Sequence, residues 1–380
     1  MKILLLMTFP LSLKDWDEAG ILEREISLYK KLQSKYNLDF SILTFGDSSE
    51  YSYKKICGNI NIIPVYEKLN KPSNYFIQLF HSLLIPFYFK KFFVDRDFIQ
   101  TNQFWGCWLA IISKIIYGKK YILRSGFEFY DFHIKHRKLH KKSKIYFLYT
   151  ILLKILSFVA YKFSNKIIIT TDASSQFIQK NFKISKFKIQ VIPNFIDTDI
   201  FKKNESISKN ERLLFIGRLS EQKGIELIFK ALSNKNIGID IIGGGKGHLR
   251  EKYKKIAEIL KIDVKFYSNI PNKSLVNFYN SCNIFIIFSN YEGNPKTLLE
   301  AMSCECAIIC SKVDGIKNIV KNDNCVLVDL NSYDLGIAIN KLHNDKDRKT
   351  KLGFQARQYI LKNNSQEIIV DNFFKVYNEL

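Results

Sequence analysis

The sequence predicts an α/β protein with two doubly wound parallel-sheet domains that face a central cleft. Three observations support this fold class. The chain has 380 residues, which suits two domains, and 47% of its residues are apolar, enough for two full cores. Short apolar runs alternate with amphipathic segments in both halves. Such alternation requires crossover connections and therefore parallel sheets covered on both faces.

The expected elements follow this alternation along the chain. Strands are expected at residues 2–7, 40–44, 98–100, 121–124, 166–170 and 189–192, then at 212–216, 238–242, 264–267, 284–288, 307–310 and 325–328. Helices are expected at residues 20–33, 75–93, 105–116, 144–163 and 174–181, then at 224–232, 247–260, 271–280, 296–303, 313–320 and 332–344. A polar stretch at residues 193–206 is interpreted as the linker. The domains are expected at 1–195 and 205–362, and a helix at 363–380 is expected to pack back toward the first domain.

The charge and cysteine content limit the class of protein. A net charge of +22 indicates an acidic partner: nucleic acid, an anionic membrane or a phosphorylated ligand. No helix-turn-helix, zinc-finger or aromatic RNA-stacking signature is visible, which argues against nucleic acid. The seven cysteines include no Cys-x-x-Cys pair and are interpreted as reduced, buried thiols of a protein in a reducing compartment.

Three apolar segments could be mistaken for membrane signals. Residues 1–7 lack a following cleavage site and are interpreted as a buried first strand. Residues 76–94 contain His81 and Pro86, and residues 145–161 contain Lys154 at their centre, so neither is predicted to span a membrane. The second segment is interpreted as a core helix of the first sheet.

A turn in the second half carries two carboxylates. Glu292 and Glu300 flank Gly293 and Pro295, and a helix is expected from Lys296 onward. A turn that opens a helix directs several backbone N–H groups toward one point, which suits an anion such as phosphate. The flanking carboxylates could accept hydrogen bonds from hydroxyl groups. The alternative is an ordinary turn before a core helix.

Two more loops follow strands of the same predicted sheet. Gly217, Arg218 and Lys223 follow the first strand, and an arginine with a lysine at this place can hold a diphosphate. Gly243 and Gly244 follow the next strand, where glycines allow a close approach of backbone to ligand. Neither loop is a dinucleotide fingerprint or a P-loop, which disfavours nicotinamide oxidoreductases and P-loop ATPases.

These motifs together resemble the retaining GT-B glycosyltransferases of family 4. The resemblance rests on Gly217-Arg218-Leu219 with Lys223-Gly224, on the glycine loop, and on the segment from Glu292 to Met302. It implies a GT-B fold of two Rossmann-like domains, in which residues 1–195 bind the acceptor and residues 205–362 bind a nucleotide-sugar.

The resemblance also implies roles for matched positions. Arg218 and Lys223 would bind the donor diphosphate, Glu292 would face the donor sugar, and Glu300 would bind the ribose hydroxyls. The implied catalytic residues are Glu292, Arg218 and Lys223. The implied donor-binding residues are Gly20, Gly217, Gly243, Gly244, Ser268, Asn269, Ile270, Gly293, Asn294, Pro295, Lys296, Thr297 and Glu300.

The first half departs from the family at one point. Many relatives carry a histidine beside the sugar, whereas residues 123–128 of this chain contain none. Arg124 or Glu128 is expected to take its place, and Asn102, Arg124 and Glu128 are the candidate acceptor residues. No metal site is expected: Asp197-Thr198-Asp199 is interpreted as a turn cap, and Arg218 with Lys223 would neutralise the diphosphate.

A basic run at residues 133–144 leaves two interpretations open. It could dock on an anionic membrane, or it could be a solvated loop before the helix at 145–161. The predicted function is transfer of a sugar from a nucleotide diphospho-sugar to a glycan or lipid-linked glycan acceptor, with retention, in bacterial surface polysaccharide or lipopolysaccharide assembly. No cofactor is expected, and the location is cytoplasmic, at the inner face of the plasma membrane. A nucleotide-sugar hydrolase or epimerase and a catalytically silent sugar-binding protein are the alternatives.

Overall fold

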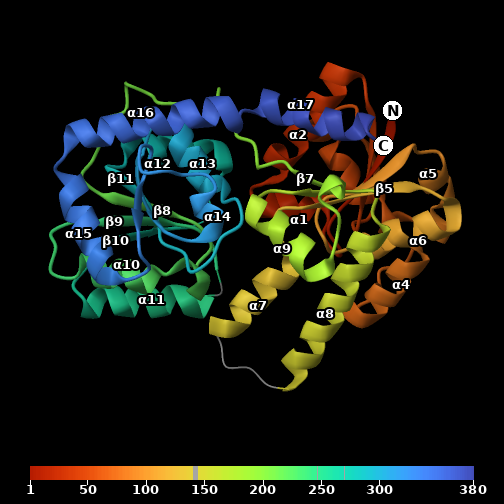
Figure 1. Ribbon diagram of the computed structural model, residues 1–380, viewed down its shortest axis with the longest axis horizontal. Helices are drawn as coiled ribbons and strands as arrows, with labels where there is room; N and C mark the ends of the chain where they lie inside the picture. Colours follow the sequence, from red (N-terminus) through yellow and green to blue (C-terminus); the bar gives the residue numbers. More distant parts are fainter. Residues whose placement is uncertain (140–143, 246, 269) are drawn as a thin grey trace. The chain divides into compact units, whose positions relative to one another are not determined.

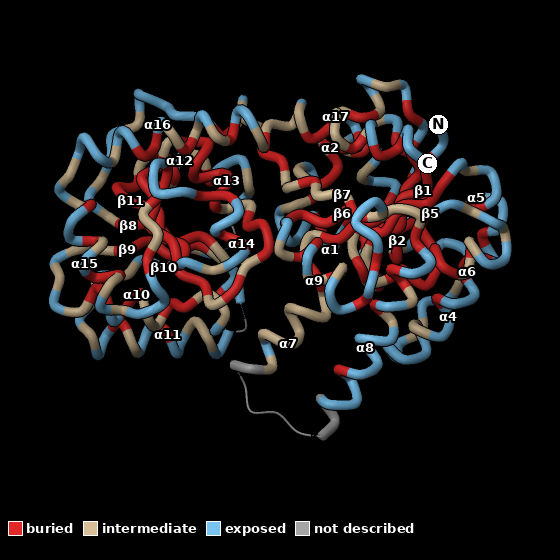
Figure 2. The backbone as a smooth tube through the Cα atoms, viewed as in Figure 1, coloured by how far each residue is buried: buried red, intermediate tan, exposed pale blue. Residues whose placement is uncertain are grey.

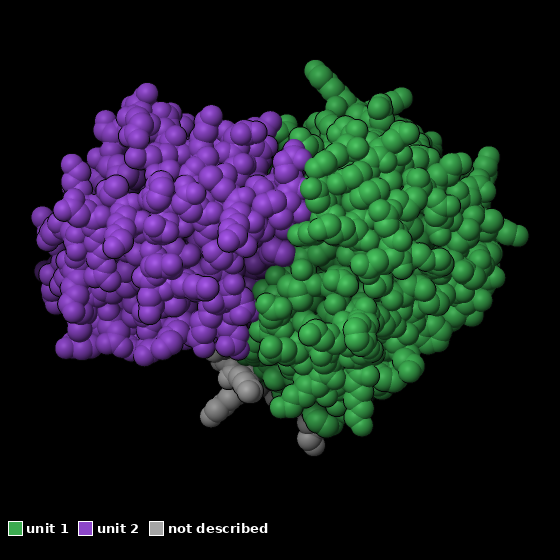
Figure 3. All heavy atoms as spheres, turned by 45° about the horizontal axis from the view of Figure 1, so that its top comes forward, with its two compact units in different colours: residues 1–192, 370–380 green, residues 193–369 purple. Residues whose placement is uncertain are grey.

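The computed structural model describes residues 1–139, 144–245, 247–268 and 270–380. The chain divides into two compact units (Figure 3). Unit 1 comprises residues 1–192 together with 370–380, and unit 2 comprises residues 193–369. Each unit is built around its own parallel β-sheet with helices on both faces, which confirms the predicted fold class (Figure 1).

The sheet of unit 1 has seven parallel strands in the order β3-β2-β1-β4-β5-β6-β7. The strands are β1 (Lys2–Leu6), β2 (Asp39–Thr44), β3 (Asn61–Pro64), β4 (Phe98–Thr101), β5 (Lys120–Ser125), β6 (Lys166–Ile169) and β7 (Ile189–Val191). In register, Ile3 of β1 pairs with Phe40 of β2 on one side and with Phe98 of β4 on the other. The strand order therefore reverses between β1 and β4.

The helices of unit 1 connect these strands. They are α1 (Leu13–Glu18), α2 (Leu22–Tyr36), α3 (Lys54–Cys57), α4 (Tyr75–Tyr88), α5 (Lys90–Val94), α6 (Cys107–Tyr117), α7 (Phe129–Leu139), α8 (Lys144–Phe163) and α9 (Asp172–Phe182). The last helix, α17 (Gln366–Asn378), supplies residues from Val370 onward to this unit. In that segment the Phe374 ring stacks on Tyr36 with centroids 3.6 Å apart, and Asp371 accepts a hydrogen bond from the Tyr36 hydroxyl at 2.7 Å.

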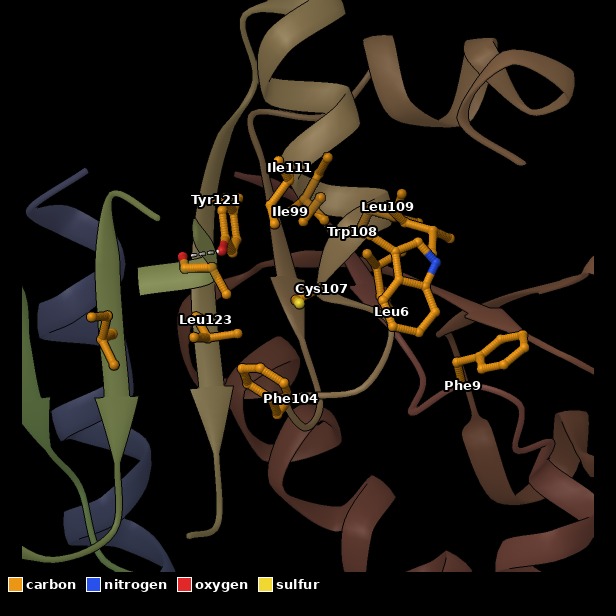
Figure 4. Close-up of a cluster of buried hydrophobic side chains, with 14 of the residues drawn as sticks. Leu6, Phe9, Ile99, Phe104, Cys107, Trp108, Leu109, Ile111, Tyr121 and Leu123 are labelled. Atoms are coloured by element: carbon orange, nitrogen blue, oxygen red, sulfur yellow. Dashed lines mark hydrogen bonds between the residues drawn. The ribbon is translucent and has the colours of Figure 1, made fainter. Parts of the chain in front are cut away.

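The main core of unit 1 lies between the sheet and α4, α6 and α8. It contains buried aromatic residues such as Phe104, Trp108 and Tyr121 (Figure 4). The polar atoms of these rings are hydrogen-bonded: Trp108 Nε1 donates to Ser82 Oγ at 2.8 Å, and the Tyr121 hydroxyl donates to the carbonyl oxygen of Ala160 at 2.5 Å. Burial of these large rings therefore leaves none of their polar atoms unsatisfied.

The sheet of unit 2 has six parallel strands in the order β10-β9-β8-β11-β12-β13. They are β8 (Leu213–Ile216), β9 (Ile239–Ile242), β10 (Val264–Tyr267), β11 (Ile284–Ile287), β12 (Ala307–Ser311) and β13 (Val326–Val328). Neighbouring residues enter different cores: Phe285 belongs to one buried cluster and Ile286 to the other. The near-continuous apolar runs arise because both faces of this sheet are covered.

The helices of unit 2 are α10 (Ile225–Leu232), α11 (Gly247–Ile259), α12 (Leu275–Ser281), α13 (Lys296–Ser303), α14 (Asp314–Lys317), α15 (Ser332–His343) and α16 (Lys346–Asn363). Residues 193–206, expected to be a linker, contribute Ile196 and Phe201 to a buried cluster of this unit. The linker interpretation stays a prediction, but these two side chains are core residues of unit 2. The apolar residues Ile196 and Phe201 within this largely polar stretch were the sequence signal that it contains core residues.

Several expected elements differ in the structure. The edge strand β3 was not expected, and its residue Pro64 cannot donate to a ladder, which weakens the strand signal. The single helix expected at 75–93 is two helices separated at Phe89. All seven cysteines are buried and free. Among the described residues, no helix has the length and apolar character needed to cross a membrane.

Candidate functional site

The candidate site lies in unit 2, in the loops that follow β8 and β11. These strands are neighbours at the centre of the sheet, where the chain order reverses. Loops at the carboxyl ends of strands beside such a reversal form the usual ligand site of doubly wound sheets. The loop after β8 carries Arg218 and Lys223, and the loop after β11 carries Glu292 and leads into α13.

The loops meet in an ion pair between two of the predicted catalytic residues. Lys223 Nζ lies 2.5 Å from Glu292 Oε1, and the two side chains are only 14% and 7% exposed. Gly224 permits this approach. Its φ is +59°, and a Cβ there would lie 2.2 Å from the carbonyl oxygen of Phe288 at the end of β11. A side chain at position 224 would therefore push Lys223 away from Glu292.

Glu292 is held by a chain of hydroxyl groups. Ser289 Oγ donates to the same Oε1 atom at 2.6 Å, and Ser311 Oγ of β12 donates to the carbonyl oxygen of Ser289 at 2.7 Å. Within the described parts of the chain, Glu292 Oε2 receives no hydrogen bond. One carboxylate oxygen is thus fixed by protein groups, and the other keeps its capacity to accept a hydrogen bond from a ligand hydroxyl.

Arg218 lies beside this pair without joining it. The side chain is exposed and forms no ion pair with any residue that the structure describes. Tyr291 is close enough to sense both charges: burial raises its pKa to about 12, the Glu292 carboxylate adds to the rise, and the Arg218 guanidinium opposes it. An exposed guanidinium has the hydrogen-bond donors and the charge that binding of an anion requires.

The first turn of α13 adds backbone donors. Pro295 is its N-cap, and the carbonyl oxygen of Pro295 accepts the N–H groups of Leu298 and Leu299 at 3.1 and 3.3 Å. The N–H of Thr297 has no acceptor within the described residues. The Lys296 ammonium lies 5.7 Å from the centre of the Phe195 ring. The predicted helix start is therefore confirmed, and its geometry is that of an anion-binding N-terminus.

The turn before α13 is fixed from two sides. Asn194 donates from its backbone N–H to Asn294 Oδ1 at 2.9 Å and from Nδ2 to the carbonyl oxygen of Asn294 at 2.6 Å. On the other side, a Cβ at Gly315 of α14 would lie 2.2 Å from the carbonyl oxygens of Glu292 and Gly293. Asn294 thus anchors the turn, a role that the sequence did not reveal. The sequence also gave no sign of the role of Gly315, because a glycine next to an aspartate occurs in many ordinary turns.

Glu300 is more enclosed than its predicted role suggested. The residue is 0% exposed. Its Oε1 accepts a hydrogen bond from Asn272 Nδ2 at 2.9 Å, and its Oε2 accepts one from the Tyr279 hydroxyl at 2.8 Å. Burial and this carboxylate raise the pKa of Tyr279 well above its ordinary value. A ribose would reach Glu300 only if the half-exposed Asn272 moved aside, and sequence reasoning did not identify Asn272 or Tyr279.

The glycine loop after β9 is explained by contact between two backbones. Gly243 has φ +149°, and a Cβ there would lie 2.1 Å from the carbonyl oxygen of Gly217. Gly217 donates to the carbonyl oxygen of Ile242 at 3.0 Å, and Leu219 donates to that of Gly244 at 2.8 Å. The predicted approach to a ligand stays a prediction. What these glycines visibly do is hold together the loops that follow β8 and β9.

The remaining residues that were predicted to bind the donor do not lie together. Ser268 is exposed and lies 3.4 Å from Arg250 Nη1, while Ile270 packs against a buried cluster. Asn269 lies outside the described residues. Gly20 belongs to unit 1, between α1 and α2, where its φ is +67° and a Cβ would meet no atom within 4 Å.

The three acceptor candidates lie in unit 1, near the carboxyl ends of β4 and β5. Arg124 Nη1 donates to the carbonyl oxygen of Asn102 at 3.0 Å and to its Oδ1 at 3.1 Å. Both residues are buried, and the Arg124 guanidinium lies 5.7 Å from the centre of the Phe373 ring. Asn102 and Arg124 are thus in contact, but in this conformation neither presents a substantial surface to a ligand.

Glu128 has a different environment from the one an acceptor ligand needs. It is 0% exposed, accepts a hydrogen bond from the Tyr161 hydroxyl at 2.6 Å, and accepts another from the Asp131 N–H at 2.5 Å before α7. Burial raises the pKa of its carboxyl group to about 7, although these bonds oppose the rise. The position favours a helix cap within the core over contact with an acceptor.

The acidic and basic segments outside the site have local partners. Asp197 Oδ1 accepts the N–H groups of Asp199 and Ile200, both at 3.1 Å, so this aspartate caps a turn as expected.

In the basic run at 133–144, Lys135 pairs with Asp131 at 2.6 Å and Arg137 lies 5.9 Å from the Phe147 ring centre. Residues 140–143 of the run lie outside the described residues.

Comparison with known proteins identifies the type of domain. Residues 197–359 match the family model of glycosyl transferases group 1. The sequence is 30% identical to an uncharacterized glycosyltransferase of Methanocaldococcus jannaschii, over 39% of this chain and only 40% of that relative. It is 24% identical to the N,N'-diacetylbacillosaminyl-diphospho-undecaprenol alpha-1,3-N-acetylgalactosaminyltransferase of Campylobacter jejuni, over 95% of this chain and 96% of the relative.

Structural similarity extends over both units. The structure matches that of Anabaena HepE, solved in complex with UDP, with a TM-score of 0.77, 15% identity and coverage of 100% of both chains. At this identity the likeness shows the fold alone. The structural matches show the GT-B fold, and residues 197–359 are similar to the glycosyl transferases group 1.

Proposed function

We propose that the protein transfers a sugar from a nucleotide diphospho-sugar to an acceptor hydroxyl, with retention of anomeric configuration. The observation that carries the proposal is the Lys223–Glu292 pair, with Nζ 2.5 Å from Oε1, next to the N-terminus of α13. It joins a cation for the donor diphosphate to a carboxylate for the donor sugar hydroxyls. An ammonium group has three donors, so Lys223 can hold Glu292 and a phosphate oxygen at once.

The proposed chemistry depends on the charge that develops on the leaving group. As the glycosidic bond breaks, the nucleoside diphosphate gains negative charge. Arg218, Lys223 and the N–H groups at the first turn of α13 would stabilise this charge without a metal ion. Glu292 Oε2 would orient the sugar through a hydroxyl. The leaving phosphate would accept the proton of the acceptor hydroxyl on the same side of the ring, which accounts for retention without a protein nucleophile.

The proposed acceptor is a glycan carried on a lipid. The full-length relative from Campylobacter jejuni is named for a diphospho-undecaprenol substrate, and this supports a polyprenyl-linked or similar acceptor in the assembly of a bacterial surface glycan. A lipid-linked acceptor would place the enzyme at the inner face of the plasma membrane. This assignment is made by analogy with that relative.

Product analysis tests the function. The protein is incubated with UDP- and GDP-sugars, with and without a polyprenyl-diphosphate glycan, and the products are identified by mass spectrometry and the new linkage by NMR. Acceptor-dependent transfer with the donor's anomeric configuration is expected, without added metal and in the presence of EDTA. Release of free sugar regardless of acceptor would indicate a hydrolase, and an altered free donor would indicate an epimerase.

A binding experiment complements the assay. A nucleoside diphosphate at a hundred times its dissociation constant should stabilise the fold by about 2.7 kcal/mol, which a thermal-shift measurement detects. Arg218→Ala should weaken this stabilisation, whereas Arg348→Ala, a basic residue on α16, should leave it unchanged. Nucleotide binding without any turnover of donor would favour a catalytically silent sugar-binding protein.

A further inference from the structure

Helix α8 of unit 1 exposes large apolar side chains on the side that faces away from the core. Thr150 and Ser157 are buried at 8% and 0% exposure, together with Leu153. On the opposite side, Phe147 and Leu148 are each 58% exposed. The expectation of a core helix at 145–161 is therefore confirmed for only one side of the helix. In Figure 2 the tube of α8 is pale blue, the colour of exposed residues, along much of its length.

Helix α4 repeats this arrangement, and α6 adds exposed apolar side chains near its C-terminal end. On α4, Phe76 is 70% exposed and Phe80 is 67% exposed, while Ser82 is buried and accepts the hydrogen bond from Trp108. On α6, Ile115 is 63% exposed while Ser113 is buried. Both α4 and α8 pack against α6, so the three helices cover one side of the sheet (Figure 1).

We call this surface the apolar face of unit 1. Its exposed members are Tyr75, Phe76, Ile77, Phe80, Leu83, Leu84, Phe87 and Tyr88 of α4, Ile115 and Ile116 of α6, and Phe147, Leu148, Tyr149, Ile151, Leu152, Ile155, Phe158 and Phe163 of α8. Single exposed apolar residues are normal on a protein surface, but a gathering of this size on adjoining helices marks an interaction site.

The charges carried by α4, α6 and α8 have one sign. The sequence contains no Asp or Glu at residues 68–94, 98–127 or 132–171, so α4, α6 and α8 carry no acidic side chain. The exposed charges there are lysines: Lys90 and Lys91 on α5 next to α4, and Lys154 and Lys162 on α8. A second copy of this face would bring like charges together, which disfavours self-association. A partner with an anionic surface and an apolar interior is complementary to the apolar face.

We propose that the apolar face of unit 1 docks on an anionic lipid bilayer. The aromatic and aliphatic side chains of α4 and α8 enter the boundary between headgroups and acyl chains, and the lysines lie at the level of the lipid phosphates. The basic run at 133–144 adjoins this surface, since Arg137 lies 5.9 Å from the centre of the Phe147 ring. The proposed docking differs from docking by that run because it depends chiefly on apolar burial rather than on charge. It agrees with a lipid-linked acceptor but does not depend on the proposed sugar transfer.

Vesicle flotation with the full chain tests the proposal. The wild-type protein should float with vesicles of 30% phosphatidylglycerol in phosphatidylcholine and bind pure phosphatidylcholine more weakly. The variants Phe76→Ser/Phe80→Ser and Phe147→Ser/Leu148→Ser should each lower the partition coefficient about tenfold or more, because each removes two deeply exposed apolar side chains. Lys154→Glu/Lys162→Glu should abolish the preference for phosphatidylglycerol.

A matched control separates the apolar face from general surface hydrophobicity. Ile259 and Tyr333 of unit 2 are 78% and 76% exposed, and Ile259→Ser/Tyr333→Ser should float like the wild type. All of these substitutions are at exposed positions, and thermal unfolding checks that each variant is folded. Wild-type flotation by both apolar-face variants would overturn the proposal. The proposal would also be overturned if the wild-type protein were a dimer that does not bind vesicles and if the apolar-face variants were monomers. Sugar transfer to a soluble acceptor is measured in parallel. This assay tests the proposed function independently of membrane docking.

Discussion

Lys223 and Glu292 come from loops 69 residues apart in the sequence and form an ion pair whose two side chains are almost enclosed by protein. Removing one partner leaves the other as an uncompensated charge in a site with little water. Loss of either residue should therefore disturb the structure of the site as well as the proposed sugar transfer, because the same two groups would hold the diphosphate and the sugar.

Replacing Lys223 with alanine is expected to lower turnover about a hundredfold, the usual effect of losing one preorganised charge contact. Steady-state kinetics with the identified donor measures this loss. The control is Lys252→Ala, whose partner Glu226 forms an exposed pair at 2.6 Å and should not affect turnover. In a double-mutant cycle, the effects of Lys223→Ala and Glu292→Ala should be far from additive, and additive effects would contradict direct coupling.

Glu300 and Asn272 should have opposite effects on nucleotide affinity. Glu300→Gln is expected to weaken binding of a nucleoside diphosphate about tenfold, because a hydrogen bond to a charged group is lost. Asn272→Ala removes the amide that competes for Glu300 Oε1, so affinity should be unchanged or higher. Isothermal titration calorimetry measures both constants. An equal loss in the two variants would show that the Asn272–Glu300 bond only supports the fold.

Gly224→Ala should destabilise unit 2 and reduce activity together. The new Cβ would meet the carbonyl oxygen of Phe288 at 2.2 Å in a backbone with φ +59°. We expect a cost of about 2 to 4 kcal/mol, measured by chemical denaturation. The control is Gly118→Ala, where φ is +67° but no atom lies within 4 Å, so that only the conformational cost of about 1 kcal/mol remains. Equal costs would show that the clash is relieved by movement of the loop.

Glu128 should make stability depend on pH. Burial raises the pKa of its carboxyl group from the ordinary value of 4.5 to about 7 in the folded protein. The folded state therefore binds the proton more tightly than the unfolded chain, and the stabilisation is fully present below pH 4.5 and lost as pH rises to about 7. The loss is about 3 kcal/mol at most. Denaturation curves between pH 5 and pH 8 should show a shallower decline in Glu128→Gln, and an unchanged slope would contradict this assignment.

The alternation of strands and helices, and most of the strands, could be predicted because apolar periodicity in a doubly wound sheet is strong. The start of α13 at Lys296 and the cap at Asp197 were also accessible, since local chemistry determines both. Contacts distant in sequence were not accessible. Examples are the enclosure of Glu300 by Asn272 and Tyr279, and the support of Glu292 by Ser289.

The apolar helix α8 shows a different limit of sequence reasoning. Its residues are apolar almost throughout, so periodicity alone does not distinguish a helix buried on all sides from one with an exposed apolar side. The informative residues were Thr150 and Ser157, whose spacing of seven marks the buried side, yet hydroxyl side chains are usually expected to face water.

Residues 370–380 complete a unit whose other residues end at 192. Tyr377 of this segment packs on Phe98 of β4 with ring centroids 5.1 Å apart, and Glu379 pairs with Lys166 of β6 at 2.6 Å. During synthesis on the ribosome, the first 192 residues emerge long before these partners exist. Unit 1 can therefore complete its core only after the whole of unit 2 has been synthesised, although unit 1 begins the chain.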